Sequence, residues 1–201
     1  MRFKDAGIWQ EWSWSELFDI VRAYAVGLTD LGLKRGDRIA IVGTNRPKLY
    51  WSIMAAQCLG AVPVPVYADA VADEMAYVLD HAEVVMAAVQ DQEQVDKLIS
   101  VKDRVPSLTQ ILYDEPRGLR DYDHSRLHPI HAIIERGIAM QHEGPDVRGR
   151  IDRAIADGKA DDMSIMLYTS GTTGRSKGVM LSAGGSVQAC RDTVAFDKLN
   201  D

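Results

Sequence analysis

The stretch YTSGTTGRSKGVMLS, residues 168–182, places three glycines and one lysine between two short apolar runs. Glycines allow the backbone to approach a polyanion closely, so that successive amide groups can point at it. Hydroxyl groups donate further hydrogen bonds to phosphate oxygens, and Lys177 supplies a positive charge for the outer phosphates. The other residues concerned are Thr169, Ser170, Gly171, Thr172, Thr173 and Gly174. A flexible surface turn is the simpler alternative, but the density of these residues favours a loop that holds a triphosphate.

A Walker-type phosphate loop is the first rival interpretation, and its spacing does not fit. That loop needs the pattern G-x-x-x-x-G-K-[ST] and continues directly into a helix. Here Gly174 precedes Lys177 by three positions, and Gly178 stands where a magnesium-binding hydroxyl would be. The apolar run GVMLS that follows predicts a strand. We therefore exclude a Walker loop.

Outside the loop, apolar runs alternate with helical patterns that are joined by short links. The expected strands are RIAIV (38–42), AVPVPVYA (61–68), VVMAAV (84–89), LTQILY (108–113) and SIMLYT (164–169). The expected helices cover about 13–31, 47–60, 73–82, 92–100 and 185–196. The strands are continuous apolar runs, which is typical of strands buried on both faces. The sequence therefore predicts an α/β domain whose mostly parallel sheet is flanked by helices on both faces.

Local signals mark several boundaries of these elements. Ser13 and Glu16 have the spacing of a capping box, and Asp73 is expected to cap the helix that follows it. Pro63 and Pro65 remove two backbone donors from one strand. The segment is therefore expected to be an edge strand or the end of a strand.

The periodic pattern weakens between residues 114 and 160. We expect a poorly ordered stretch there, with helices over about 128–140 and 148–156. Three histidines of this stretch have a spacing that could suggest a metal site: His124, His128 and His131. Pro129 interrupts the helical register, so a solvated surface cluster is the better interpretation.

Composition and charge exclude several classes of protein. The 23 basic and 29 acidic residues give a formal charge of −6, which argues against non-specific binding to nucleic acid or to an anionic membrane. The start MRFKDAG is no secretory signal, and the longest apolar stretch is too interrupted to span a bilayer. Cys58 and Cys190 follow apolar helical spacing, and both are predicted to be small core residues. These features predict a cytoplasmic protein.

The loop is similar to the phosphate-binding signature of the adenylate-forming superfamily, which includes acyl-CoA synthetases, firefly luciferase and the adenylation domains of peptide synthetases. Its pattern is [YF]-T-S-G-[ST]-T-G-x-P-K-G-V, and residues 168–179 depart from it only at Ser176, where proline is usual. Proline would stiffen the loop, so the departure affects rigidity and removes no ligand. The segments LGLKRGDRIAIVGTNRPKLYW and AAQCLGAVPVPVYADAVADEMAYVLDHAE resemble the bacterial long-chain fatty acid–CoA ligase branch. Ala183 stands where these ligases often carry a histidine.

The resemblance implies a two-step reaction with ATP, Mg²⁺, a fatty acid and coenzyme A. An acyl adenylate forms with release of pyrophosphate, and coenzyme A then attacks it to give a thioester. Residues 169–174 would orient the pyrophosphate, and Lys177 would stabilise it. We expect an incomplete N-terminal AMP-binding domain that lacks the C-terminal domain and its catalytic lysine. Such a domain would be inactive alone and would self-associate through exposed apolar surface, and its parent enzyme could lie peripheral to a membrane.

Two alternatives stay open at this point. An adenylating enzyme for aryl or amino acids would share the loop and differ in its acyl pocket. A non-catalytic module that binds a nucleotide or a partner protein would fit the departures at Ser176 and Ala183. A local basic group is interpreted as a solvated face, with a coenzyme A site left open: Lys34, Arg35, Arg38, Arg46 and Lys48.

Overall fold

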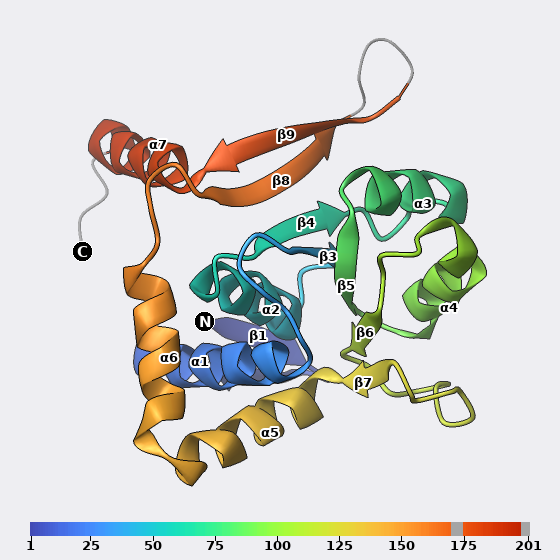
Figure 1. The fold of residues 1–201 in the computed structure, drawn as a ribbon, viewed down its shortest axis with the longest axis horizontal. Coiled ribbons are helices and arrows are strands. Elements are labelled where there is room, and N and C mark those ends of the chain that lie inside the picture. Colours follow the sequence, from blue (N-terminus) through green and yellow to red (C-terminus); the bar gives the residue numbers. More distant parts are fainter. Residues whose placement is uncertain (170–174, 198–201) are drawn as a thin grey trace.

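A five-stranded parallel sheet is the framework of the computed structural model, which describes residues 1–169 and 175–197 (Figure 1). The strand order is β4-β3-β5-β6-β7, and each neighbouring pair is parallel. The strands are β3 (Arg38–Val42), β4 (Val62–Val66), β5 (Val84–Val89), β6 (Gln110–Tyr113) and β7 (Leu127–Pro129). The predicted α/β class with a mostly parallel sheet is confirmed.

Helices cover both faces of this sheet because successive side chains of each strand point to opposite sides. Ile39 and Ile41 belong to the core on the side of α1 (Trp14–Asp30), α2 (Pro47–Cys58) and α5 (Ile130–Glu143). Ala40 and Val42 belong to the core on the side of α3 (Ala72–His81) and α4 (Gln92–Ser100). The side chains on both faces of such a strand therefore have to be apolar.

Of the two predicted helix caps, one is present in the structure and the other is not. The capping box before α1 is confirmed, because the backbone N–H of Ser13 donates to the Glu16 carboxylate over 2.8 Å while the Ser13 hydroxyl accepts from the backbone N–H of Glu16. The predicted cap at Asp73 is wrong. Val71 occupies the N-cap of α3 without a side-chain cap, and the Asp73 carboxylate pairs with Arg104.

Residues 114–160 contain a loop followed by regular elements. The chain has no helix or strand between β6 and β7, over residues 114–126. Helices α5 and α6 (Pro145–Ala156) then follow, close to the helices expected at 128–140 and 148–156. Helix α5 begins only at Ile130 because Pro129 is extended and still belongs to β7.

The loop predicted to bind phosphate connects an antiparallel hairpin, β8 (Met163–Thr169) and β9 (Lys177–Ser182), which α7 (Ala183–Asp197) follows. Strand β8 lies alongside β4, yet the hairpin forms a separate sheet (Figure 1). In β4 the N–H of Val62 donates to the Asp37 carbonyl on the β3 side. The nitrogens of Pro63 and Pro65 therefore face the outer edge, where they offer no hydrogen. The predicted edge position of β4 is confirmed, and the prolines leave two positions of this edge without a donor, which disfavours a ladder with β8.

A further two-stranded hairpin lies at the beginning of the chain, β1 (Arg2–Asp5) with β2 (Ile8–Glu11), and a short 3₁₀ turn η1 (Lys102–Arg104) follows α4. Among the described residues, none of the helices combines the length and the apolar character needed to cross a membrane.

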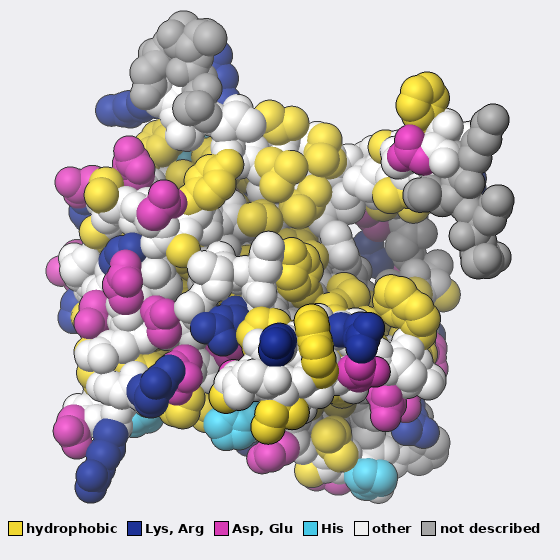
Figure 2. All heavy atoms as spheres, turned by 180° about the vertical axis from the view of Figure 1, so that it is seen from behind, with side chains coloured by type: hydrophobic (Ala, Val, Ile, Leu, Met, Phe, Trp, Pro, Cys, Tyr) yellow, Lys and Arg dark blue, Asp and Glu magenta, His cyan; other side chains and the backbone are white. Residues whose placement is uncertain are grey.

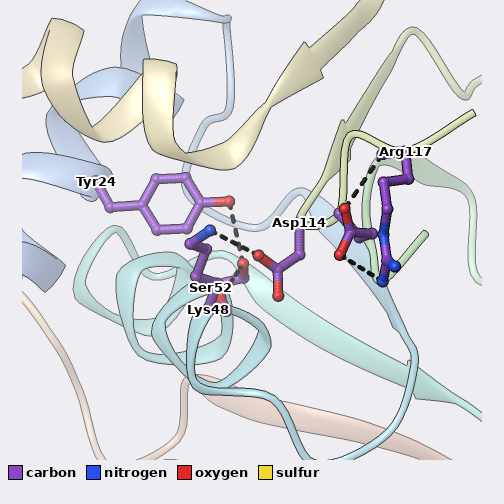
Figure 3. A network of polar contacts seen from close by, with 6 residues as sticks. Tyr24, Lys48, Ser52, Asp114 and Arg117 are labelled. Carbon is purple, nitrogen blue, oxygen red and sulfur yellow. Dashed lines mark hydrogen bonds and ion pairs between the residues drawn. The ribbon is translucent and has the colours of Figure 1, made fainter. Parts of the chain in front are cut away.

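A polar network ties the first two helices to the end of β6 (Figure 3). The Lys48 ammonium lies 2.7 Å from the Asp114 carboxylate, and the Ser52 hydroxyl donates to the Lys48 carbonyl over 2.8 Å. The hydroxyl of Tyr24, which is fully buried on α1, lies 3.0 Å from the Ser52 hydroxyl. The network therefore fixes α1, α2 and the carboxyl edge of the sheet relative to one another.

The prediction for the cysteines is correct at one position only. Cys58 is partly buried against the core on the α1 side, whereas Cys190 is exposed. No residue of α7 is buried, because this helix contacts mainly β8 and β9. The helical spacing of apolar residues predicted a buried face of α7, but no other described element covers that face.

Helices α1 and α5 approach so closely that glycine is required at their contact. A Cβ atom on Gly137 would overlap the backbone carbonyl of Ala23. We expect Gly137→Ala to lower the free energy of unfolding by about 1–3 kcal/mol, measured by urea denaturation. Gly149→Ala is the matched control, since its Cβ would meet only the movable end of Arg153, and it should be neutral or stabilising. Equal effects of both variants would contradict the close contact.

Burial raises the pKa of the Tyr24 hydroxyl above its ordinary value. The unfolded chain loses this proton near pH ~10, while the folded chain keeps it, so stability should fall as pH rises beyond that point. Tyr24→Phe should cost about 1 kcal/mol at pH 7 but should reduce the alkaline loss by up to about 1.4 kcal/mol per pH unit. Urea unfolding between pH 8 and pH 11 measures both, and identical pH slopes would count against the assignment.

Candidate functional site

The two ends of the predicted phosphate loop are held opposite each other by the β8–β9 hairpin. Thr169 ends β8, Lys177 begins β9, and the two residues are direct partners in the ladder. Directly opposed residues place their side chains on one face of a sheet, and both residues are exposed. The other predicted ligands, Ser170, Gly171, Thr172, Thr173 and Gly174, lie outside the described residues. A strand follows the loop, as the rejection of a Walker loop required.

Lys177 lies at the β9 end of the loop, and Arg175 is the other cation at this end. Within residues 1–169 and 175–197, none of the ion pairs involves Lys177. Its ammonium group is therefore not neutralised by a described carboxylate. In a chain with a formal charge of −6, a local cation of this kind is what an anionic ligand would need.

Helix α3 contacts both ends of the loop through side chains one turn apart. The His81 Nδ1 atom lies 2.6 Å from the Tyr168 hydroxyl, just before the loop. The Tyr77 hydroxyl donates to the Ser176 carbonyl over 3.2 Å, just after the loop. The Arg175 guanidinium lies over the Tyr77 ring, 5.5 Å from its centroid. The hairpin is thus attached by side chains to the helix that covers the sheet.

Sequence reasoning missed Tyr77 and His81 because helical periodicity assigns them only to one face of a helix. Their i, i+4 spacing, with a polar tip on each side chain, was the available signal. Their partners lie 87 and 99 residues further along the chain, so no local pattern could identify them.

Gly178 is opposite Tyr168 in the hairpin, and the aromatic ring explains the glycine. A Cβ atom at this position would lie 3.2 Å from Cζ of Tyr168 and 3.3 Å from Sδ of Met166. Any larger side chain would push the ring away from His81. This glycine serves the packing of the hairpin.

Burial raises the pKa of the Tyr168 hydroxyl above its ordinary value, and the neighbouring Tyr77 adds to the shift. The hydroxyl is therefore protonated at neutral pH and can donate to His81 Nδ1 when that nitrogen carries no hydrogen. The contact is then a hydrogen bond between neutral groups, which needs no counter-ion.

A cavity of about 460 Å³ adjoins the end of β8 at the carboxyl edge of the sheet. Gly43 follows β3, Tyr67 follows β4, and both line the cavity together with Thr169. Ligands of parallel α/β sheets bind outside the carboxyl ends of the strands. The cavity is of a size that accepts small molecules, so the loop and a binding hollow share one edge.

A larger cavity, about 1600 Å³, lies elsewhere, between helices α1 and α2 and the hairpin with α7. Its walls include Phe18, Met54 and Val187, and it does not include the described ends of the phosphate loop. Hydrophobic side chains gather along the upper part of the molecule, over the hairpin, and in the hollow beneath it (Figure 2). The lining of this cavity is mostly apolar and includes neither Thr169 nor Lys177.

In the two other candidate clusters of the sequence, the side chains have separate partners. His128 Nε2 lies 2.8 Å from the Gln110 amide oxygen, whereas His124 Nε2 lies 3.0 Å from the Leu119 carbonyl. In the part of the chain that the structure describes, no three His, Cys, Asp or Glu residues are placed to hold a metal ion. In the basic group, Arg35 pairs with Asp162, Arg38 with Glu83 and Lys48 with Asp114, which splits it among three ion pairs.

Comparison with known proteins agrees with this geometry. A family model described as AMP-binding enzyme matches residues 2–200. The chain belongs to the AMP-binding enzyme family. A long-chain-fatty-acid–CoA ligase of Rattus norvegicus, ACSBG1, is 27% identical over 181 residues, which are 90% of this chain and 24% of the relative. The ligase FadD15 of Mycobacterium bovis is 27% identical over 192 residues, which are 94% of this chain and 29% of the relative.

The fold of this chain is also found among solved structures. The crystal structure of a long-chain-fatty-acid–CoA ligase, FadD1, from Archaeoglobus fulgidus superimposes with a TM-score of 0.70 at 16% identity. The match covers 92% of this chain and 32% of that protein. The chain spans about a quarter of the length of the curated relatives it matches.

Proposed function

We propose that residues 169–177 bind the triphosphate of ATP, accompanied by Mg²⁺, in the activation of a fatty acid as its coenzyme A thioester. The observation that carries this proposal is the position of the hairpin. Its loop ends lie at the carboxyl edge of a parallel sheet, beside a cavity, with Lys177 exposed on the same face as Thr169. Membership in the AMP-binding family supports a nucleotide as the ligand.

The chemical role of these residues is to hold and neutralise the leaving group. A carboxylate oxygen of the acid attacks the α-phosphorus of ATP, and the bond from that phosphorus to the bridging oxygen breaks. Pyrophosphate leaves with the electron pair. The charge of Lys177 and the hydroxyl of Thr169 stabilise it there, which is positioning and electrostatic stabilisation without covalent catalysis. In the second step the coenzyme A sulfur attacks the acyl carbonyl, the bond from the acyl carbon to the phosphate oxygen breaks, AMP leaves with the electron pair, and the thiol proton is released to solvent.

A long-chain fatty acid is the substrate we propose, because the named relatives are long-chain-fatty-acid–CoA ligases. The matched region covers only 24% and 29% of these relatives. We therefore propose that these 201 residues bind the nucleotide and do not complete the reaction by themselves.

Calorimetric titration with MgATP tests the role of the lysine. We expect saturable binding to the chain and at least tenfold weaker binding to Lys177→Ala, because the variant loses the local cation. Lys159→Ala removes an equally exposed lysine distant in sequence from the loop and should leave the affinity unchanged. None of the three proteins should form acyl-CoA from ATP, palmitate and coenzyme A.

Equal affinity of Lys177→Ala and the unchanged chain would contradict the proposed site. Absence of binding by all three proteins would contradict the sufficiency of these 201 residues, and acyl-CoA formation by the unchanged chain would contradict the proposed division of the reaction.

The apolar surface on β9 and α7 should lead to self-association of the chain. Met180 is 64% exposed and Val187 is 51% exposed, and both lie on elements with little cover. We expect the mass measured by sedimentation equilibrium to rise with concentration, because burial of this surface is favourable. Combined Met180→Lys and Val187→Lys should shift the chain toward monomer. Ile138→Lys on α5, which is 44% exposed, is the control and should have no such effect.

A further inference from the structure

We propose that Tyr77 and His81 are positioning residues that fix the phosphate loop from α3. We call the set Tyr77, His81, Tyr168, Arg175 and Ser176 the α3 clamp. The proposal deepens the proposed function and rests on it, since a loop that binds a triphosphate must present its donors in one arrangement. It concerns how this chain holds the ends of the loop.

The clamp contacts both ends of the loop from a single rigid element. His81 meets the hydroxyl of Tyr168 over 2.6 Å, one residue before the end of β8. Tyr77 donates to the carbonyl of Ser176 over 3.2 Å, one residue before β9 begins. Because Tyr77 and His81 are four residues apart, they lie on one face of α3, and their partners are held at a fixed separation.

The stacking contacts restrict the same side chains further. The His81 and Tyr168 rings meet edge to face with centroids 5.8 Å apart, and the Tyr77 and His81 rings are 5.6 Å apart. The Arg175 guanidinium lies over the Tyr77 ring, 5.5 Å from the ring centroid. Aromatic and cation–π pairs at these separations favour one orientation of the partners.

The clamp is needed because the backbone pairing that would otherwise hold the hairpin is missing. Pro63 and Pro65 leave the outer edge of β4 without N–H groups at two positions, and β8 forms no ladder with it. The position of the hairpin on the sheet therefore depends on side-chain contacts. Those of α3 lie nearest to the loop.

The clamp also restrains the residue at which this chain departs from the superfamily pattern. Serine at position 176 leaves φ free, whereas proline would fix it. The hydroxyl of Tyr77 holds the carbonyl of this same residue. This hydrogen bond acts on ψ of residue 176, whereas proline would act on its φ. We therefore assign to Tyr77 a restraint on the residue that proline restrains elsewhere in the pattern.

Amide hydrogen exchange of the unliganded chain, together with MgATP titration, tests the clamp. Tyr77→Phe removes one hydroxyl and keeps the ring under Arg175. We expect amides of residues 166–169 and 177–180 to exchange about three- to tenfold faster, and MgATP affinity to fall by a similar factor. The control is Tyr122→Phe, whose hydroxyl bonds Asp96 and Gln92 away from the hairpin, and it should change neither quantity.

Rescue separates positioning from a general loss of stability. Adding Ser176→Pro to Tyr77→Phe should return exchange and affinity to within about twofold of the unchanged chain, because it restores a restraint at the same residue. Added to the unchanged chain, it should have little effect. For the other end, His81→Phe and Tyr168→Phe should each speed exchange, and the double variant should be no faster than either single one.

Unchanged exchange in Tyr77→Phe, or a failure of Ser176→Pro to restore it, would overturn the proposal. If the unchanged chain binds no MgATP, these 201 residues are not sufficient for nucleotide binding, whereas the exchange rates of the unliganded variants still decide whether the clamp exists.

Discussion

The missing N–H groups on the outer edge of β4 determine how the rest of the site is built. A sheet grows by backbone pairing, and Pro63 and Pro65 stop that growth at β4. The next hairpin of the chain nevertheless packs beside this edge. It has to be held by side chains: Gln57 of α2 donates to the Ser164 carbonyl of β8, and near the loop Tyr168 and Ser176 meet α3. Proline in one strand thus transfers the positioning of the loop to a helix more than 80 residues earlier.

Electrostatics makes that positioning important. The chain carries a net negative charge, so attraction of an anionic ligand depends on cations placed at the loop rather than on the field of the whole protein. The strongest basic cluster of the sequence contributes little, because Arg35, Arg38 and Lys48 are already paired with carboxylates. Lys177 and Arg175 remain, both at the β9 end of the loop. One begins a strand, and the other is stacked on Tyr77.

Apolar side chains are buried in one part of the molecule and exposed in another. The sheet with its two helical layers has a fully buried core on each face. The hairpin and α7 have no comparable cover among the described residues, and the large apolar cavity lies between them and the first two helices (Figure 2). The matched relatives are about four times longer than the matched region, so this chain corresponds to a minor part of their architecture.

The sequence by itself determined the α/β class, the edge position of β4 and most element positions, with β1, β2 and β7 as the strands it missed. These features are local: burial on both faces produces continuous apolar runs, and glycine, proline and capping residues act within a few positions of where they stand. Asp73 looked like a cap by the same logic, yet its carboxylate pairs with Arg104 instead. Only the tertiary structure decided such partners, the exposure of Cys190 and the meeting of Tyr77 and His81 with the hairpin. Helical periodicity indicates which face of a helix is buried. Which residues pack against that face depends on contacts between segments far apart in the chain.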